Sequence, residues 1–223
     1  FFLQNFSSGF TDFFWESWSL SIEEWFYLSI PLIIIFFHLF FSKKNALLAT
    51  IVCLITIPLL YRISISGTNV DGFWWDVNFR KVVLTRLDAI IYGVLAAYLK
   101  FYYSIFWSKY RNPMFLLGLT LLFLSMIIPT EANDFYTKTF YFSLVSIGAM
   151  FLLPIADSLK TINSVWFNKA VTHISKISYS MYLVNLALIA QVIDYNFPAQ
   201  STLERVYLYA LYWSSTIVLS TLI

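Results

Sequence analysis

The sequence predicts an all-α fold, a polytopic bundle of about seven transmembrane helices. Of the 223 residues, 60% are hydrophobic and 21% are aromatic, whereas only 12% are charged. A soluble domain carries about 25% charged residues. The mean hydropathy of +0.73 agrees with this bias. The apolar residues also gather into runs close to the roughly 20 residues that cross a bilayer. These observations together indicate a membrane protein.

Polar connectors with turn-forming residues separate the apolar runs, among them SKKN, SGTNVDG and PTEAND. The second run is short and contains Pro58, and the third begins with Arg86 and Asp88. No repeat or second domain is visible, so residues 1–223 are predicted to form a single membrane domain. In chain order we expect spans at residues 25–41, 46–61, 82–99, 113–129, 139–156, 177–193 and 206–223.

The distribution of positive charge predicts the orientation. Connectors 42–45, 100–112 and 157–176 hold eight cations and one acid, Asp157. Cytoplasmic loops are enriched in Lys and Arg, so these connectors should be cytoplasmic and residues 1–24 should lie outside. The cytoplasmic cations would suit either anionic lipid or the phosphates of acyl-CoA.

Several function classes are excluded by composition. The net charge is +2 and no basic tract is present, which argues against nucleic acid as a partner. The one cysteine, Cys53, lies in an apolar run, so neither an internal disulfide nor a thiolate metal site can form. Nucleophile-elbow and phosphate-loop motifs are absent. We therefore expect neither a metal nor a bound cofactor.

Two adjacent carboxylates lie at the start of the first run, in the stretch WSLSIEEWFYLSIPL. Ser21 and Glu24 fit a capping box that would pair the free N–H groups of a helix start. Glu23 points about 100 degrees away from Glu24 and cannot serve the same cap. Glu23 is therefore either an ordinary acid near a helix N-terminus or part of a site.

The same stretch resembles a known family signature. The string WSLSIEE at residues 18–24, followed by FY and a proline, is similar to that of the acyltransferase 3 superfamily, polytopic bacterial membrane O-acyltransferases that modify surface polysaccharides. RLD at residues 86–88 and ISYSMYL at residues 177–183 resemble two further family strings in the right order.

The sequence also departs from that family. An Arg followed eleven residues later by a His, the pair to which acyl transfer is assigned, has no counterpart here. Asn185 stands where the family often has a histidine, and an amide can only donate or accept hydrogen bonds. The chain is therefore interpreted as an internal fragment that lacks the first helices and the C-terminal end.

The resemblance implies transfer of an acyl group, most simply acetyl, from cytoplasmic acyl-CoA to a hydroxyl of a cell-surface or exported glycan in the bacterial inner membrane. The implied partners are acyl-CoA, a glycan or lipid-linked saccharide acceptor, and membrane lipids. A histidine outside these residues would be the general base. One alternative is a transporter or polysaccharide-export component without acyl transfer. Another is a relative of the membrane-bound O-acyltransferases, which need an intramembrane His.

Two residues are candidate catalytic groups under this resemblance, Glu23 as an orienting carboxylate and Arg86 as an anion contact. The alternatives for Arg86 are pairing with Asp88 or Asp76, or reaching the headgroups. A polar stripe that includes Tyr182 either joins helices or lines a donor path. The candidate substrate-binding residues are Trp18, Ser21, Tyr27, Asp88, Tyr182 and Asn185.

A small-residue stripe, Ala89, Gly93 and Ala97, repeats at four-residue spacing in the third run. Such a stripe lets a second helix approach closely, so this face and the neighbouring Arg86 should face protein. The outer loop DGFWWD at residues 71–76 has aromatic rings and carboxylates of the kind that bind sugars, although aromatic residues near a bilayer more often form an interfacial belt.

Overall fold

The computed structural model describes residues 3, 5, 6, 17–128, 130–159, 165–184, 189 and 202–222. The secondary structure of these residues is helical, in agreement with the predicted fold class. The chain divides into two compact units, one built on residues 17–159 and the other on residues 165–222.

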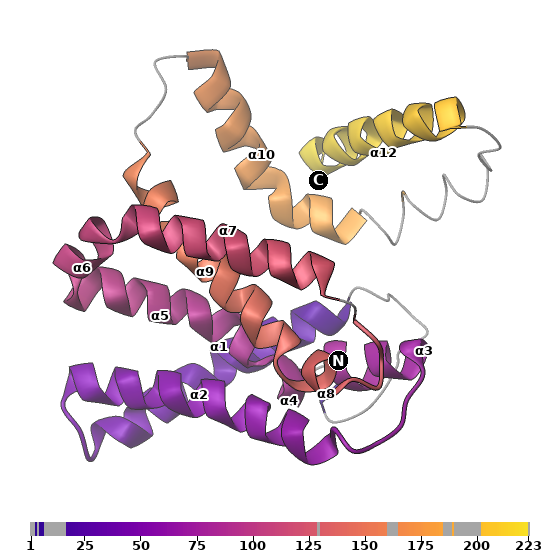
Figure 1. Ribbon diagram of the computed structural model, residues 1–223. Helices are drawn as coiled ribbons and strands as arrows, with labels where there is room; N and C mark the ends of the chain where they lie inside the picture. Colours follow the sequence, from indigo (N-terminus) through magenta and orange to yellow (C-terminus); the bar gives the residue numbers. More distant parts are fainter. Residues whose placement is uncertain are drawn as a thin grey trace. The chain divides into compact units, whose positions relative to one another are not determined.

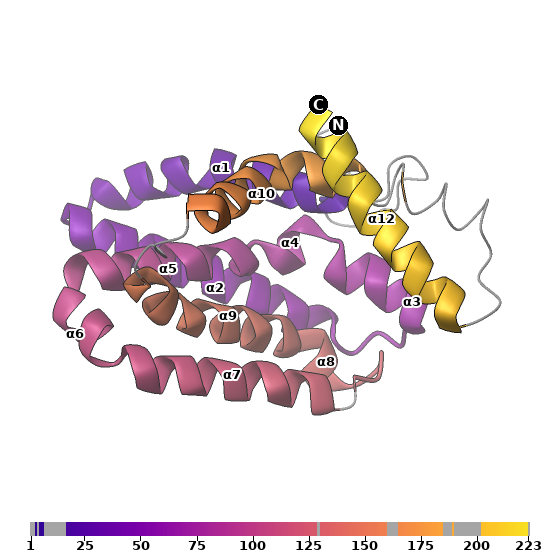
Figure 2. The same cartoon turned by 90° about the horizontal axis from the view of Figure 1, so that it is seen from above.

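The first unit is a row of long helices, each packed against the next (Figures 1 and 2). Helix α1 packs on α2, α2 on α5, α5 on α9, and α9 on α7. A core of buried side chains from α1, α2 and α5 includes Phe26, Leu54 and Ile91. The bounds are α1 Ser17–His38, α2 Lys43–Ile65, α5 Asp88–Tyr102, α7 Arg111–Ile127 and α9 Tyr141–Ser158.

Short helices lie at the two ends of this row. The end with α3 and α8 is here called the α3 end, and the opposite end, crossed by α6, is called the α6 end (Figure 1). The bounds are α3 Gly72–Trp75, the π-helix η1 Asp76–Arg80, α4 Val83–Arg86, α6 Ser104–Lys109 and α8 Phe135–Thr139.

Fewer spans are supported than the sequence predicted. Among the described residues, α1, α2 and α9 are long and apolar enough to cross a membrane, and Gly72–Arg80 with Val83–Tyr102 would count as a fourth, bent by 79°. Helix α7 is apolar but has 17 residues. The sixth predicted span is displaced, because its helix runs over Val165–Val184. Residues 185–188 and 190–193 lie outside the described residues.

At the bend in the third span, backbone N–H groups at the start of α4 donate hydrogen bonds to residues that precede α1. The N–H of Val83 donates to the carbonyl of Asn5 at 2.8 Å, and that of Leu84 donates to Phe6 at 3.4 Å. The hydroxyl of Thr85 donates to the carbonyls of Phe79 and Val82, at 2.7 and 2.8 Å. Residues that precede α1 therefore supply hydrogen bonds that the start of α4 lacks within its own helix.

Helix α1 begins at Ser17, so Ser21 and Glu24 lie inside its second turn. The capping box that the sequence predicted at these residues is therefore wrong. Ser21 is buried, whereas Glu24 is exposed. The first turn of α1 contains no acid.

A buried lysine joins α8 to the end of α2. The ammonium of Lys138 donates to the carbonyls of Ser66 and Thr68, at 3.1 and 2.6 Å, and to the side-chain oxygen of Asn133 at 3.3 Å. The cation also lies 5.9 Å from the ring centre of Phe79. These oxygens replace water around a charge whose residue is 1% exposed.

A close helix approach occurs between α7 and α9, not along the predicted stripe. A Cβ placed on Gly118 would lie 2.8 Å from the carbonyl oxygen of Gly148, and one on Gly148 would lie 2.9 Å from Leu122. On the predicted stripe, Gly93 and Ala97 are exposed. No atom of the described residues lies within 4 Å of a Cβ placed on Gly93. Glycine is therefore needed for contact on α7 and α9.

The second unit pairs α10 (Val165–Val184) with α12 (Thr202–Leu222). Val184 and Ile189 form its buried cluster, packed by Leu208 and Tyr212. His173 on α10 lies 3.0 Å from the hydroxyl of Thr221 on α12.

Candidate active site

A buried ion pair lies near the α3 end of the first unit. Arg62, in the last turn of α2, binds Asp88, the first residue of α5, through two parallel contacts. Nη1 donates to Oδ1 at 3.0 Å, and Nη2 donates to Oδ2 at 2.7 Å. The side chains are 0% and 1% exposed. This fork geometry is the strongest arrangement available to an Arg and a carboxylate.

Ser143 and Thr85 add further hydrogen bonds to this pair. The Ser143 hydroxyl, from the first turn of α9, accepts from Arg62 Nη2 at 2.8 Å and donates to Asp88 Oδ2 at 3.0 Å. The carbonyl of Thr85 accepts from Arg62 Nη1. One guanidinium therefore joins α2, α4, α5 and α9 at a single point.

Arg86 is not paired with either predicted acid. Asp88 is bound to Arg62, and Asp76 forms ion pairs with Arg80 and Lys81. Instead, the Arg86 guanidinium lies 4.4 Å from the ring centre of Phe142 on α9. Its Nε is buried and has no hydrogen-bond partner among the described residues.

Phe142 is the centre of this site. Trp75 stacks on its ring at 5.6 Å with an interplanar angle of 12°, and the Arg62 guanidinium lies 5.8 Å from the ring centre. Trp75 Nε1 and Arg62 Nε are also buried without a partner in the described part of the chain. Three N–H donors around one ring thus lack an acceptor, although buried donors are normally paired.

The charges of this site do not balance. Arg62 and Arg86 bring two positive charges, and Asp88 brings one negative charge. Because charge effects strengthen away from water, the remaining cation favours a ligand with negative or developing negative charge. The arrangement can therefore hold an anion or polarise a carbonyl oxygen.

The contacts of the predicted site residues on α1 do not involve the cluster around Phe142. Trp18 is half-buried, with the Arg80 guanidinium 5.8 Å from its ring centre. Glu23 is exposed, and the ion pairs between described residues do not include it. Tyr27, four residues further on, is 61% exposed.

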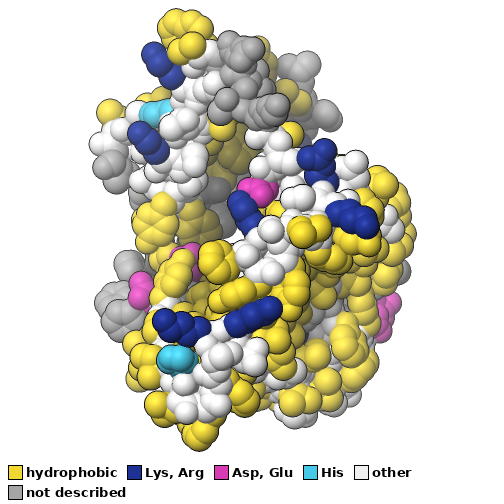
Figure 3. All heavy atoms as spheres, turned by 90° about the vertical axis from the view of Figure 1, so that its left-hand side faces the viewer, with side chains coloured by type: hydrophobic (Ala, Val, Ile, Leu, Met, Phe, Trp, Pro, Cys, Tyr) yellow, Lys and Arg dark blue, Asp and Glu magenta, His cyan; other side chains and the backbone are white. Residues whose placement is uncertain are grey.

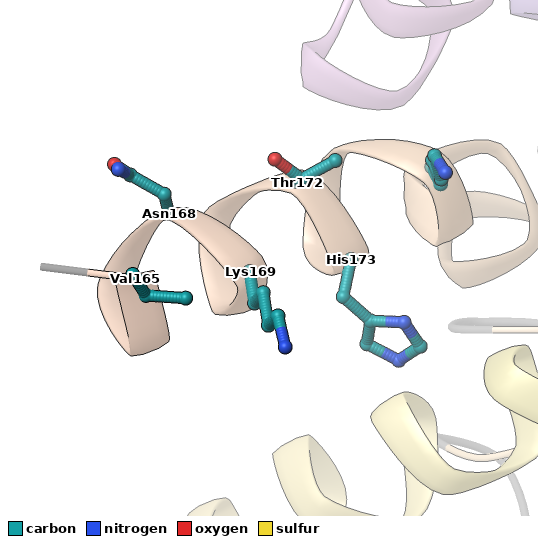
Figure 4. A pocket seen from close by; sticks show the side chains of 6 residues that line it. Val165, Asn168, Lys169, Thr172 and His173 are labelled. Carbon is teal, nitrogen blue, oxygen red and sulfur yellow. The ribbon is translucent and has the colours of Figure 1, made fainter. Parts of the chain in front are cut away.

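The remaining predicted residues belong to the second unit or fall outside the described residues. Tyr182 lies on α10 and is 36% exposed, and Asn185 is not among the described residues. Along α10 an open depression is lined by residues of that helix alone, with His173 directed toward α12 (Figure 4). In the part of the chain that the structure describes, no group of three or more His, Cys, Asp or Glu could hold a metal ion.

Sequence reasoning missed Arg62, Phe142 and Ser143. Arg62 precedes the third span and Asp88 lies near its start, but the two residues are 26 positions apart and no spacing in the sequence indicates that they pair. No motif marked Phe142 or Ser143.

Comparison with known proteins gives a consistent result. A family model described as "Acyltransferase domain" matches residues 1–223. A provisionally named O-acetyltransferase of Staphylococcus aureus (strain COL) is 29% identical over 221 residues, covering 92% of this chain and 34% of that protein. The O-acetyltransferase OatA of S. aureus (strain NCTC 8325 / PS 47) is 28% identical over 188 residues, covering 80% of this chain and 30% of that protein.

This chain spans about a third of the length of the curated relatives it matches. No solved structure matches it.

Proposed function

Because the chain belongs to the acyltransferase 3 family, we propose that the full-length protein transfers an acyl group, most simply acetyl, from cytoplasmic acyl-CoA to a glycan hydroxyl. The acceptor would be a cell-surface or exported glycan, free or lipid-linked. The protein would lie in the bacterial inner membrane among membrane lipids, with seven crossings in this segment and the α3 end outside.

The observation that carries the proposal is the unbalanced positive charge around Phe142. Among the residues that the structure describes, Arg86 has no carboxylate partner and its Nε has no acceptor. Leaving such a group buried is costly unless a ligand completes it. A carbonyl, carboxylate or phosphate oxygen of a substrate would supply the missing acceptor.

The reaction gives this charge a use. The acceptor hydroxyl oxygen forms a bond to the acyl carbon, the carbon–sulfur bond of the thioester breaks, and the hydroxyl proton passes through a base to the departing sulfur. Negative charge develops on the carbonyl oxygen during the attack. A fixed guanidinium such as Arg86 stabilises that charge without reorganisation.

Arg62 acts as a positioning residue in this proposal. Asp88 lies two residues from Arg86 and would neutralise it if it were free. Arg62 occupies both Asp88 oxygens, and Ser143 binds one of them as well. Asp88 is therefore proposed to act on the substrate indirectly. Because Asp88 is paired with Arg62, it does not neutralise the positive charge of Arg86.

Glu23 is proposed to act from α1 as an orienting group, either for the acceptor or for the family histidine outside these residues. Its exposure leaves it accessible to such a partner. Trp18, Ser21 and Tyr27 lie on the same helix and are proposed to contact substrate. Tyr182 and Asn185 are proposed to line the donor path.

The experiment measures acetylated glycan in cells that carry the full-length protein at matched levels. Arg86→Gln should lower the product by about a hundredfold, the usual effect of losing one donor to developing charge. Arg86→Lys should retain part of the activity, because the charge stays but the fork is lost. The matched control is Arg205→Gln, which removes an exposed cation from α12. Unchanged product in Arg86→Gln would exclude Arg86 from the site.

The competing function, glycan transport without acyl transfer, has its own outcome. Purified full-length protein is given acetyl-CoA labelled in the acetyl group together with the glycan. Label in the glycan supports the acyltransferase. Glycan export that depends on the protein, without transfer of label, would overturn the proposal.

A further inference from the structure

Helix α6 crosses the α6 end of the first unit and is held there by contacts with α9. Trp107 is buried, and its indole N–H donates to Asp157 Oδ2 on α9 at 3.2 Å. Lys100, near the end of α5, pairs with the other oxygen of Asp157. These contacts connect α6 to the ends of α5 and α9.

Helix α6 and the residues next to it expose several apolar side chains. Ile105 is 82% exposed and Phe101, just before α6, is 79% exposed. Tyr103, Phe106 and Tyr110 are also exposed. Exposed apolar residues gathered in one place indicate a contact with an apolar medium or partner.

Cations surround this apolar area. The ammonium of Lys44 lies 4.4 Å from the ring centre of Tyr103, and that of Lys109 lies 5.6 Å from the ring centre of Tyr110. Lys43 and Arg111 are exposed. Figure 3 views this end and shows dark blue cationic side chains among yellow apolar ones.

Little negative charge offsets these cations. Within residues 38–46, 99–114 and 155–159, all of which the structure describes, the one acid is Asp157, and Lys100 already pairs with it. The four other cations are Lys43, Lys44, Lys109 and Arg111.

We propose that this area binds the phosphate groups of anionic phospholipids. This area is here called the α6 surface. It consists of the exposed side chains of Phe101, Tyr103, Ile105, Phe106 and Tyr110 and the cations Lys43, Lys44, Lys109 and Arg111. A cationic rim around exposed apolar and aromatic groups matches a lipid, whose phosphate and acyl chains lie side by side. A free polyphosphate such as that of coenzyme A would use the cations alone and leave Ile105 and Phe101 without a partner. The apolar component therefore favours lipid.

The test uses full-length protein purified in detergent and exchanged into mixed vesicles of phosphatidylcholine with 30% phosphatidylglycerol. After repurification, the phosphatidylglycerol retained per protein is measured by mass spectrometry. The variant Lys109→Gln/Arg111→Gln should retain at least threefold less than the parent. The control, Arg80→Gln/Arg205→Gln, removes two cations that do not belong to the α6 surface and should retain as much as the parent. Equal retention in all three proteins would overturn the proposal.

Two further measurements distinguish lipid binding at the α6 surface from simple charge attraction and from binding of the acyl donor. Ile105→Ser should also lower retention, although it removes no charge, and an unchanged value would contradict the apolar contribution. Free coenzyme A should leave the retained lipid unchanged. Displacement of phosphatidylglycerol by coenzyme A at this surface would overturn the proposal in favour of a donor site. Size-exclusion profiles identical to that of the parent confirm that each variant is folded.

Discussion

The two ends of the first unit use charge in opposite ways. At the α3 end, Arg62, Asp88 and Lys138 are almost completely buried, and each binds two or more polar atoms. At the α6 end, Lys100 and Asp157 pair while partly exposed, and the other cations lie over tyrosine rings or in the open. Buried charges fix structure because water cannot replace a lost partner, whereas exposed charges act mainly through their field.

The largest effect should come from breaking the pair at the α3 end. Arg62→Leu should lower the free energy of unfolding by about 3 to 5 kcal/mol, because Asp88 is left charged and buried. The double variant Arg62→Leu/Asp88→Leu should recover most of that loss, since no lone charge remains. Thermal unfolding of the full-length protein in detergent measures both. A single variant as stable as the parent would show that the pair is unimportant for folding.

An intermediate effect is expected in the middle of the row, where α7 meets α9. Gly118→Ala places a methyl group 2.8 Å from a backbone carbonyl that cannot move aside, so a loss of about 1 to 3 kcal/mol is expected. Gly93→Ala is the matched control, because its methyl group meets nothing within 4 Å. It should be neutral or slightly stabilising, since Ala favours the helix over Gly. Equal melting temperatures for the two variants would contradict the close approach.

The smallest effect is expected at the α6 end. Lys100→Gln removes an ion pair whose members are 55% and 37% exposed. Solvent already screens that pair, so the melting temperature should change by an amount close to the resolution of the measurement. Melting curves at low and high salt provide the check, because added salt screens an exposed pair and any small difference seen at low salt should shrink further. A loss comparable to that of Arg62→Leu would show that the two ends do not differ in kind.

The long helices of the first unit could be predicted because their signal is local. Runs predicted at residues 25–41 and 46–61 correspond to Ser17–His38 and Lys43–Ile65. The first helix starts earlier than predicted because it continues past Glu23 and Glu24, which point to the exposed side. Apolar content alone did not indicate that a helix can extend beyond the apolar run.

The site was predicted only in part. Arg86 and Asp88 stood out through a family string, but the partner of Asp88 lies 26 residues away in sequence. Such a contact depends on how α2 and α5 pack, which hydropathy does not specify. Phe142 and Ser143 follow from the position of α9 in the same way. The role of Glu23 stays a prediction.

The hydrogen bonds from Val83 and Leu84 to the carbonyls of Asn5 and Phe6 tie the beginning of this chain to the bent third span. Arg86 follows only three residues after Val83, in the same short helix. A pull on the polypeptide ahead of α1 would therefore be transmitted through main-chain atoms to the guanidinium proposed to meet the acyl group. A bulky fusion placed there is expected to disturb the proposed site through main-chain atoms alone.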